Sequence, residues 1–100
     1  MATNEVLKAL SDPTRREILN LLRKRDLAAG EIADRFPLAR STLSSHFNVL
    51  KEAGLIVCER QGTSLVYSRN ESVFEEALAA LLELLSGEKR TARTRKAVAR

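Results

Sequence analysis

The stretch from Ala39 to Leu55, ARSTLSSHFNVLKEAGL, constrains the fold of this 100-residue chain more than any other. At about 100° per residue along a helix, Leu43, Phe47 and Leu50 fall on one side, which must therefore pack against the rest of the protein. The opposite side carries small polar residues, namely Ser41, Ser44, Ser45 and Asn48. Serine and asparagine are indifferent helix formers, so packing or solubility alone does not explain them. We predict a helix whose exposed face comes close to another molecule.

Helix signals upstream of this stretch predict three more helices. The apolar residues of VLKAL at positions 6–10 mark a short first helix. Asp12 as N-cap and Pro13 as first helical residue begin a second helix, which is expected to run to about Lys24. A third helix of about two turns is predicted over residues 31–36, after a short extended link at 27–29.

A turn at Pro37–Ala39 joins the third predicted helix to the fourth, which is a helix-turn-helix pattern. Gly54 is placed to end the fourth helix. Two segments with strand propensity follow, at 55–58 and 65–67, and a turn at 61–64 connects them as a hairpin. The expected fold class is therefore mainly α with a small β-hairpin, as in a winged helix-turn-helix.

The last predicted helix opens with a capping box made by Ser72 and Glu75 and runs to about Ser86. Its apolar sector is too wide for a 100-residue monomer to cover, and the first helix offers a second apolar surface. We predict that residues from both helices pair two subunits across a two-fold axis, namely Val6, Leu7, Leu10, Phe74, Leu78, Leu81, Leu82 and Leu85. The alternative, in which both helices complete the core of a monomer, stays open.

The charge of the chain is unevenly distributed along its length. Residues 1–86 contain 11 Lys and Arg against 12 Asp and Glu, a net charge of −1. Residues 87–100 contain six basic residues against Glu88, a net charge of +5. We therefore expect a folded domain over 1–86 and a basic, disordered tail over 87–100. The tail is either a solubilising segment or an arm that adds non-specific affinity for nucleic acid.

Several classes of function lack their required residues. No apolar run approaches the roughly 20 residues of a membrane span, so we expect a soluble, cytoplasmic protein. Cys58 is the one cysteine and is expected to be a small buried hydrophobe. His46 alone cannot form a metal site and has no evident Ser or Cys partner for nucleophilic catalysis. We expect neither enzymatic activity nor a cofactor.

Recognition of the major groove accounts for the small polar face of residues 39–55. Short hydroxyl and amide side chains allow a helix to approach base edges and to form hydrogen bonds with them. Arg40 can pair with guanine or hold a phosphate, and a hairpin turned by Gly62 can reach the backbone or the minor groove. The predicted DNA-binding residues are Arg40, Ser41, Thr42, Ser44, Ser45, His46, Asn48, Arg60, Gln61 and Thr63. The alternative for each region is an ordinary solvated surface.

The segments SDPTRREILNLL, GEIADRFPLARSTLSSHFNVLKEAGL and ERQGTSLVYS resemble the winged helix-turn-helix repressors of the ArsR/SmtB family. Within that family the chain is most similar to the metal-independent, SdpR-like subgroup. The resemblance implies a homodimer paired through its first and last helices, a recognition helix at 40–53 and a β-wing around 60–67. The chain departs from the metal-sensing members, because LAAGEIADRF has no thiol and the last helix has no histidine.

The sequence therefore predicts a sequence-specific regulator, most simply a homodimeric repressor or autorepressor that binds an inverted repeat in double-stranded DNA. No residue pattern identifies an effector. Two other functions stay open, namely a protein-interaction module built on a winged helix and an architectural DNA binder without sequence preference.

Overall fold

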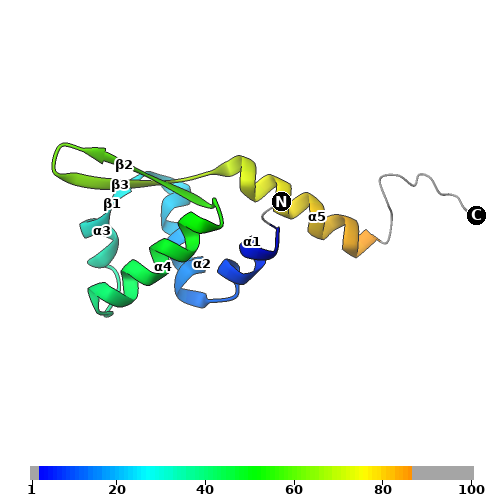
Figure 1. Ribbon diagram of the computed structural model, residues 1–100, viewed down its shortest axis with the longest axis horizontal. Coiled ribbons are helices and arrows are strands. Elements are labelled where there is room, and N and C mark those ends of the chain that lie inside the picture. The colour runs from blue at the N-terminus through cyan, green and yellow to red at the C-terminus, as the bar shows by residue number, and fades with distance from the viewer. Residues whose placement is uncertain (1–2, 87–100) are drawn as a thin grey trace, which may run out of the picture.

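The computed structural model describes residues 3–86, which form five helices and three strands (Figure 1). In chain order these are α1 (Thr3–Leu10), α2 (Pro13–Lys24), β1 (Leu27–Ala28), α3 (Ala29–Ala33), α4 (Arg40–Glu52), β2 (Ile56–Gln61), β3 (Ser64–Arg69) and α5 (Glu71–Ser86). The mainly helical fold with a small hairpin is therefore confirmed. The predicted basic tail at residues 87–100 lies outside the described residues.

The three strands form an antiparallel sheet in the order β1-β3-β2. The hairpin between β2 and β3 is confirmed, with Cys58 opposite Tyr67, and Gly62 has a φ of 64° in its turn. The sequence predicts only a short extended link at residues 27–29, but Leu27 belongs to an additional strand, β1, and pairs with Tyr67 of β3. A strand of two residues has no propensity signal of its own, because its hydrogen bonds depend on a partner far away in the sequence.

The hydrophobic core lies between α2, α4 and the inner face of the sheet. Ile18, Ile32, Leu50 and Ile56 are among the large side chains that are fully buried there. Phe47 of α4 stacks on Tyr67 of β3, with ring centroids 4.6 Å apart. The recognition helix predicted from the sequence is thus held to the sheet by an aromatic pair as well as by aliphatic contacts.

The helix boundaries agree with the sequence signals in most places. The Asp12 carboxylate accepts the backbone N–H of Arg15 at 3.0 Å, as expected for the N-cap of α2. Gly54 follows α4 with a φ of 78°, a left-handed conformation that suits glycine. Both boundary predictions are confirmed.

Two helix starts differ from their predictions. The third helix begins at Ala29, because Glu31 lies in its first turn and accepts the backbone N–H of Ala28 at 2.8 Å. The last helix begins at Glu71, so Ser72 lies inside the helix and does not cap it. In both cases the helix begins one or two positions before the residue that the sequence signal indicates.

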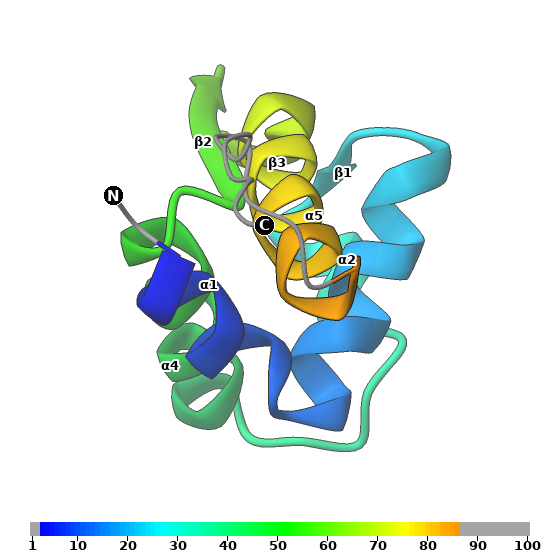
Figure 2. The same ribbon diagram turned by 90° about the vertical axis from the view of Figure 1, so that its right-hand side faces the viewer.

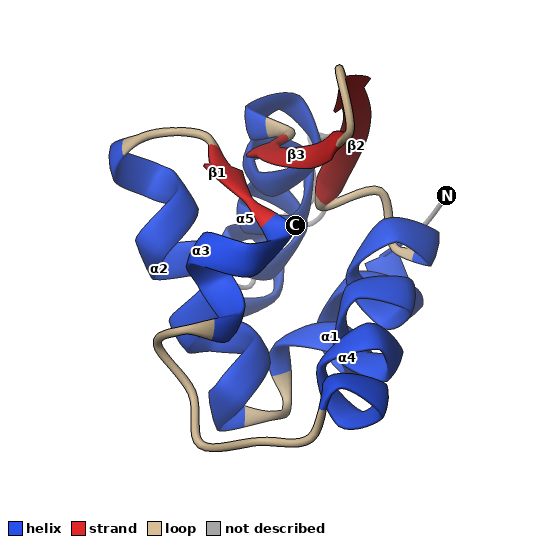
Figure 3. Cartoon of the chain, turned by 90° about the vertical axis from the view of Figure 1, so that its left-hand side faces the viewer, coloured by secondary structure: helices blue, strands red, loops and turns tan. Residues whose placement is uncertain are grey.

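The wing and α5 extend from opposite ends of the molecule, as Figure 1 shows. The view along α5 in Figure 2 places α1 and α4 on one side of it and α2 on the other. α1 contacts α2, α4 and α5. From the opposite end, Figure 3 shows α3 and α4 joined by the loop of the helix-turn-helix. Among residues 3–86, the helices are too short or too polar to cross a membrane.

Candidate nucleic-acid interface

One side of α4 is buried and the opposite side is free. Leu43, Phe47 and Leu50 are between 0 and 7% exposed, since they pack on the core. The predicted groove-facing residues of this helix are exposed, namely Arg40, Ser41, Thr42, Ser44, Ser45 and Asn48. The described chain does not cover these side chains. The helix therefore presents a continuous row of hydroxyl and amide groups beside one guanidinium.

The N-terminus of α4 has no side-chain cap. Its N-cap residue is Ala39, whose methyl group cannot accept a hydrogen bond. The first helical bond is made by the N–H of Leu43 to the carbonyl of Ala39, so the N–H groups of Arg40, Ser41 and Thr42 precede the helical hydrogen-bond ladder. Unpaired N–H donors at the positive end of a helix dipole attract phosphate oxygens. This end of the helix and Arg40 thus form one region suited to an anion.

His46 lies at the side of this face, in a different environment from its neighbours. Its side chain is 15% exposed, and its Nδ1 atom lies 3.1 Å from Nη1 of Arg15 and 3.9 Å from Oδ2 of Asp12. A guanidinium has no lone pair to share, so Nδ1 accepts the hydrogen bond and the neutral ring carries its proton on Nε2. The sequence predicts His46 among the DNA contacts, but the structure places it in an interhelical contact instead of on the open row.

The carboxylate of Asp12 is held in its charged form by the same contacts. Burial acts to raise its pKa, but the hydrogen bond from the backbone N–H of Arg15 and the electrostatic effects of the nearby His46 and Arg15 side chains outweigh this effect. The pKa of Asp12 therefore lies below its ordinary value of 3.8. Asp12 remains negative at neutral pH and supports the start of α2.

The two arginines at the start of α2 are engaged within the protein. Arg15 donates from Nε to the carbonyl of Ala9 at 2.7 Å and from Nη2 to that of Lys8 at 3.2 Å. Arg16 donates to the carbonyl of Leu10 at 2.7 Å. These carbonyls belong to the last turn of α1. The carbonyl of Lys8 also accepts the N–H and the hydroxyl of Ser11, whereas those of Ala9 and Leu10 have no N–H of α1 left to bind them. Both guanidinium groups therefore close the C-terminus of α1.

The wing divides its predicted DNA contacts between two faces. Arg60, Gln61 and Thr63 are all exposed. Because side chains alternate along a strand, Arg60 shares a face with its partner Leu65, and this is also the face of Tyr67. Tyr67 stacks on α4, so Arg60 lies on the recognition-helix side of the hairpin.

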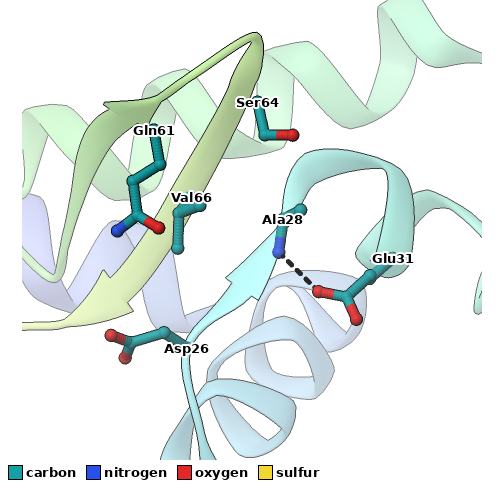
Figure 4. A pocket seen from close by; sticks show the side chains of 6 residues that line it. All are labelled: Asp26, Ala28, Glu31, Gln61, Ser64 and Val66. Carbon is teal, nitrogen blue, oxygen red and sulfur yellow. Dashed lines mark hydrogen bonds between the residues drawn. The ribbon is translucent and has the colours of Figure 1, made fainter.

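Gln61 lies on the other face of the wing, over an open cleft beside β1 (Figure 4). The carboxylates of Asp26 and Glu31 also line the cleft, and that of Glu31 accepts a hydrogen bond from the backbone N–H of Ala28. Glu31 is paired with Arg25 at 3.6 Å, and the carboxylate of Asp26 disfavours a phosphate backbone at this position. The structure thus brings Arg60, but not Gln61, to the side of the hairpin that faces α4.

The predicted pairing residues occupy three environments. Leu78, Leu81, Leu82 and Leu85 on α5 are between 38 and 82% exposed, and Leu7 on α1 is 38% exposed. Leu10 and Phe74 are half-buried against the core of the same subunit. Val6 is 1% exposed and belongs to that core, so its assignment to a free surface is wrong. The helical period of α1 turns Val6 inward and its neighbour Leu7 outward.

Metal-ligating and thiol chemistry have little support in residues 3–86. No group of three or more His, Cys, Asp or Glu side chains is placed to hold a metal ion in that range. Cys58 is half-buried in β2 opposite Tyr67, less enclosed than the buried hydrophobe expected from the sequence. Burial and the neighbouring Cys58 raise the pKa of Tyr67 above its ordinary value.

Comparison with known proteins shows that this chain is similar to bacterial transcriptional regulators. Residues 12–57 match the family described as bacterial regulatory proteins of the arsR family. The transcriptional repressor SdpR of Bacillus subtilis (strain 168) is 41% identical over 83 residues, covering 83% of this chain and 92% of that protein. The crystal structure of an ArsR family transcriptional regulator has a TM-score of 0.80 at 28% identity, over 86% of this chain and 94% of that one. An ArsR-like regulator from Rhodococcus sp. RHA1 has a TM-score of 0.79 at 29% identity, and the match covers 86% of this chain and 79% of that one.

The fold and the exposed polar helix define a winged helix-turn-helix regulator that binds DNA. These three relatives are named as transcriptional regulators, the Bacillus subtilis protein as a repressor. The chain belongs to the ArsR family of bacterial transcriptional regulators.

Proposed function

We propose that this protein is a homodimeric repressor that recognises an inverted repeat in duplex DNA, its own promoter being the first candidate. The observation that carries the proposal is the exposed polar face of α4 opposite its buried apolar side. Hydroxyl and amide groups of this size can form hydrogen bonds with base edges while the helix backbone enters the major groove. The name of the similar Bacillus subtilis protein, a transcriptional repressor, supports repression rather than activation.

The interface divides into contacts that position the protein and contacts that read sequence. Arg40 and the uncapped N-terminus of α4 bind phosphates, and Arg60 on the wing binds the backbone or the minor groove. Ser44, Ser45 and Asn48 follow along the helix and read bases. Residues 1–86 carry a net charge of −1, so attraction to DNA in this part of the chain depends on these local basic groups rather than on overall charge.

The exposed leucines of α5 support the homodimer. Leu78, Leu81, Leu82 and Leu85 form one apolar side of a helix that projects from the body of the subunit (Figure 1). A two-fold interface would remove these side chains from water in both copies at once, with Leu7 of the neighbouring α1 at its border. Such a dimer sets its two recognition helices about 34 Å apart, one turn of DNA, which requires an inverted repeat.

Fluorescence anisotropy with labelled duplexes tests the proposal. The wild-type protein is expected to bind the DNA upstream of its own gene more tightly than a scrambled duplex, by a factor of about 10³. Its affinity should fall steeply with salt. Equal affinity for both duplexes would mean an architectural binder, and no affinity for either would mean a protein-interaction module.

A substitution on the recognition face makes the test specific. Ser44→Glu places a carboxylate where the proposal puts base edges, so we expect it to abolish operator binding without changing the melting temperature by more than a few degrees. Asn20→Glu adds the same charge to an exposed position of α2 and should keep most of the affinity. Removal of residues 87–100 should lower affinity for all sequences while the preference for the operator stays. A variant Ser44→Glu that still binds the operator contradicts the assignment of α4.

A further inference from the structure

We propose that Arg15 positions the recognition helix for DNA binding, because its side chain joins the end of α1 to His46 on α4. It would thereby set the orientation of the reading helix relative to the helices that pair the subunits. The inference rests on the proposed function, in which α4 reads DNA while α1 and α5 lie at the dimer interface.

The guanidinium of Arg15 uses all three of its nitrogen atoms in this contact. Nε and Nη2 donate to the carbonyls of Ala9 and Lys8, at 2.7 and 3.2 Å. Nη1 lies 3.1 Å from Nδ1 of His46. Since a guanidinium is planar, the directions of these three bonds are fixed relative to one another. A displacement of the end of α1 must therefore move His46 or break a bond.

Asp12, the N-cap residue of α2, completes the cluster. Its Oδ2 atom accepts the backbone N–H of Arg15 at 3.0 Å and lies 3.9 Å from Nδ1 of His46. The C-terminus of α1, the N-terminus of α2 and the middle of α4 therefore meet around one arginine. The cluster is half-buried, so the hydrogen bonds are partly shielded from competing water.

The position of His46 explains why this link bears on sequence reading. His46 follows the exposed Ser45 and precedes the buried Phe47, so it lies at the border between the two sides of α4. Phe47 fixes the buried side against Tyr67, whereas His46 fixes the rotation of the helix at its edge. Contacts to bases require side chains held within about 0.5 Å, but contacts to phosphates tolerate larger shifts. Loss of the link should therefore reduce specific binding more than non-specific binding.

Arg16 supplies a matched control, because it closes the same helix end at Leu10 and has no described contact with α4. We expect Arg15→Met to lower the ratio of operator affinity to scrambled-DNA affinity about tenfold, as for the loss of one partly buried hydrogen bond. Arg16→Met should leave this ratio unchanged. Anisotropy titrations of the two variants, at equal protein concentration and salt, measure the ratio directly.

A measurement without DNA separates this inference from the proposed function. Nitrogen-15 NMR of the wild-type ring should show a neutral imidazole with its proton on Nε2, and the amide signals of α4 should shift in Arg15→Met but not in Arg16→Met. His46→Asn retains an acceptor near the position of Nδ1 and should preserve the α4 signals and the affinity ratio better than His46→Leu. This second pair decides the question if Arg15→Met does not fold.

Two outcomes are informative in opposite ways. If Arg15→Met and Arg16→Met give the same affinity ratio and the same α4 spectra, Arg15 only caps α1 and the inference is wrong. If the wild-type protein does not distinguish the operator from scrambled DNA, the proposed function is wrong, while the spectra still show whether Arg15 holds α4 in place.

Discussion

Some side chains in this protein contact two helices at the same time, and Asp12 is one of them. Its carboxylate caps α2 through the backbone N–H of Arg15 and lies near His46 of α4. Burial acts against its charge, yet the hydrogen bond from Arg15 and the nearby His46 and Arg15 side chains keep its pKa below the ordinary value. Because its pKa is lower in the folded state than in the unfolded state, the ionised form stabilises the fold.

This linkage predicts how stability depends on acid. The contribution of Asp12 is fully present above its unfolded pKa of 3.8 and is lost as the pH falls through the lower folded pKa. Asp12→Asn keeps an N-cap but has no charge to lose, so it should be less stable than wild type at about pH 6 and nearly equal to it at about pH 2. Urea unfolding of both proteins across this range measures the difference. A constant difference would show that the charge of Asp12 does not contribute.

At the scale of the element, the end of α4 fixes the direction in which the chain enters the wing. Gly54 has a φ of 78°, and the backbone N–H of Leu55 then returns to the carbonyl of Leu50 at 3.0 Å. Residues with a Cβ atom adopt this conformation at a cost of about 1–2 kcal/mol. A Cβ at Gly54 would lie 3.6 Å from Cγ2 of Val73, which is an ordinary contact. The conformation, not the available space, is what requires glycine.

We therefore expect Gly54→Ala to lower the free energy of unfolding by about 1 kcal/mol. Gly30 is the matched control, because it lies inside α3, where an added Cβ would meet no heavy atom within 4 Å and the backbone angle is ordinary. Gly30→Ala should raise the free energy of unfolding by up to about 1 kcal/mol, since alanine is the better helix former. Chemical denaturation compares the two variants. Equal effects would mean that the conformation of Gly54 does not limit stability.

The elements of this fold are predictable to the extent that their signals are local. The two sides of α4, the cap at Asp12 and the turn at Gly62 each follow from spacing or residue type over a few positions. The pairing of β1 with β3 does not, because a two-residue strand is defined by a partner 40 positions away. The start of α5 lies before its predicted position, because serine resembles a cap in sequence even inside a helix.

The residues of the candidate site are likewise predictable only where their sequence signals are local. The exposed row on α4 is predictable from helical period, whereas the contact of Arg15 with His46 spans 31 residues and leaves no local pattern. Strand alternation is sufficient to place Arg60 and Gln61 on opposite faces of the wing. Which face lies toward α4 depends on the stacking of Tyr67 on Phe47, a tertiary contact.

On the scale of the whole molecule, the surfaces proposed to read DNA and to pair two subunits lie on different elements, and α1 contacts both α4 and α5. The wing and α4 occupy one part of the subunit, and the projecting part of α5 occupies the other (Figure 1). Arg69 secures the start of α5, with its Nη1 donating to the carbonyl of Leu19 and its guanidinium 4.1 Å from the ring centre of Phe74. In a dimer formed through α5, these contacts would hold the start of each α5 helix to the core of its own subunit.

Disruption of the pairing surface should abolish DNA binding as well as dimerisation. Leu82 is 52% exposed on α5, and burial of such a side chain contributes about 2 kcal/mol in each subunit. We expect Leu82→Glu to elute as an 11.1 kDa monomer and to lose operator affinity, because one recognition helix alone contacts half a site. Leu38→Glu, at a 38% exposed position in the loop before α4, should remain dimeric. Light scattering during gel filtration gives both masses, and a dimeric Leu82→Glu would contradict the proposed interface.

The stacking of Phe47 on Tyr67 has a practical consequence. Tyr67 is the one tyrosine of the chain, which has no tryptophan, so the intrinsic ultraviolet emission of the protein originates almost entirely beside the recognition helix. Any tilt of that helix changes the surroundings of the emitting ring. An unlabelled, unmodified sample therefore reports by its own luminescence whether a small molecule, a partner or DNA has moved the helix proposed to read sequence.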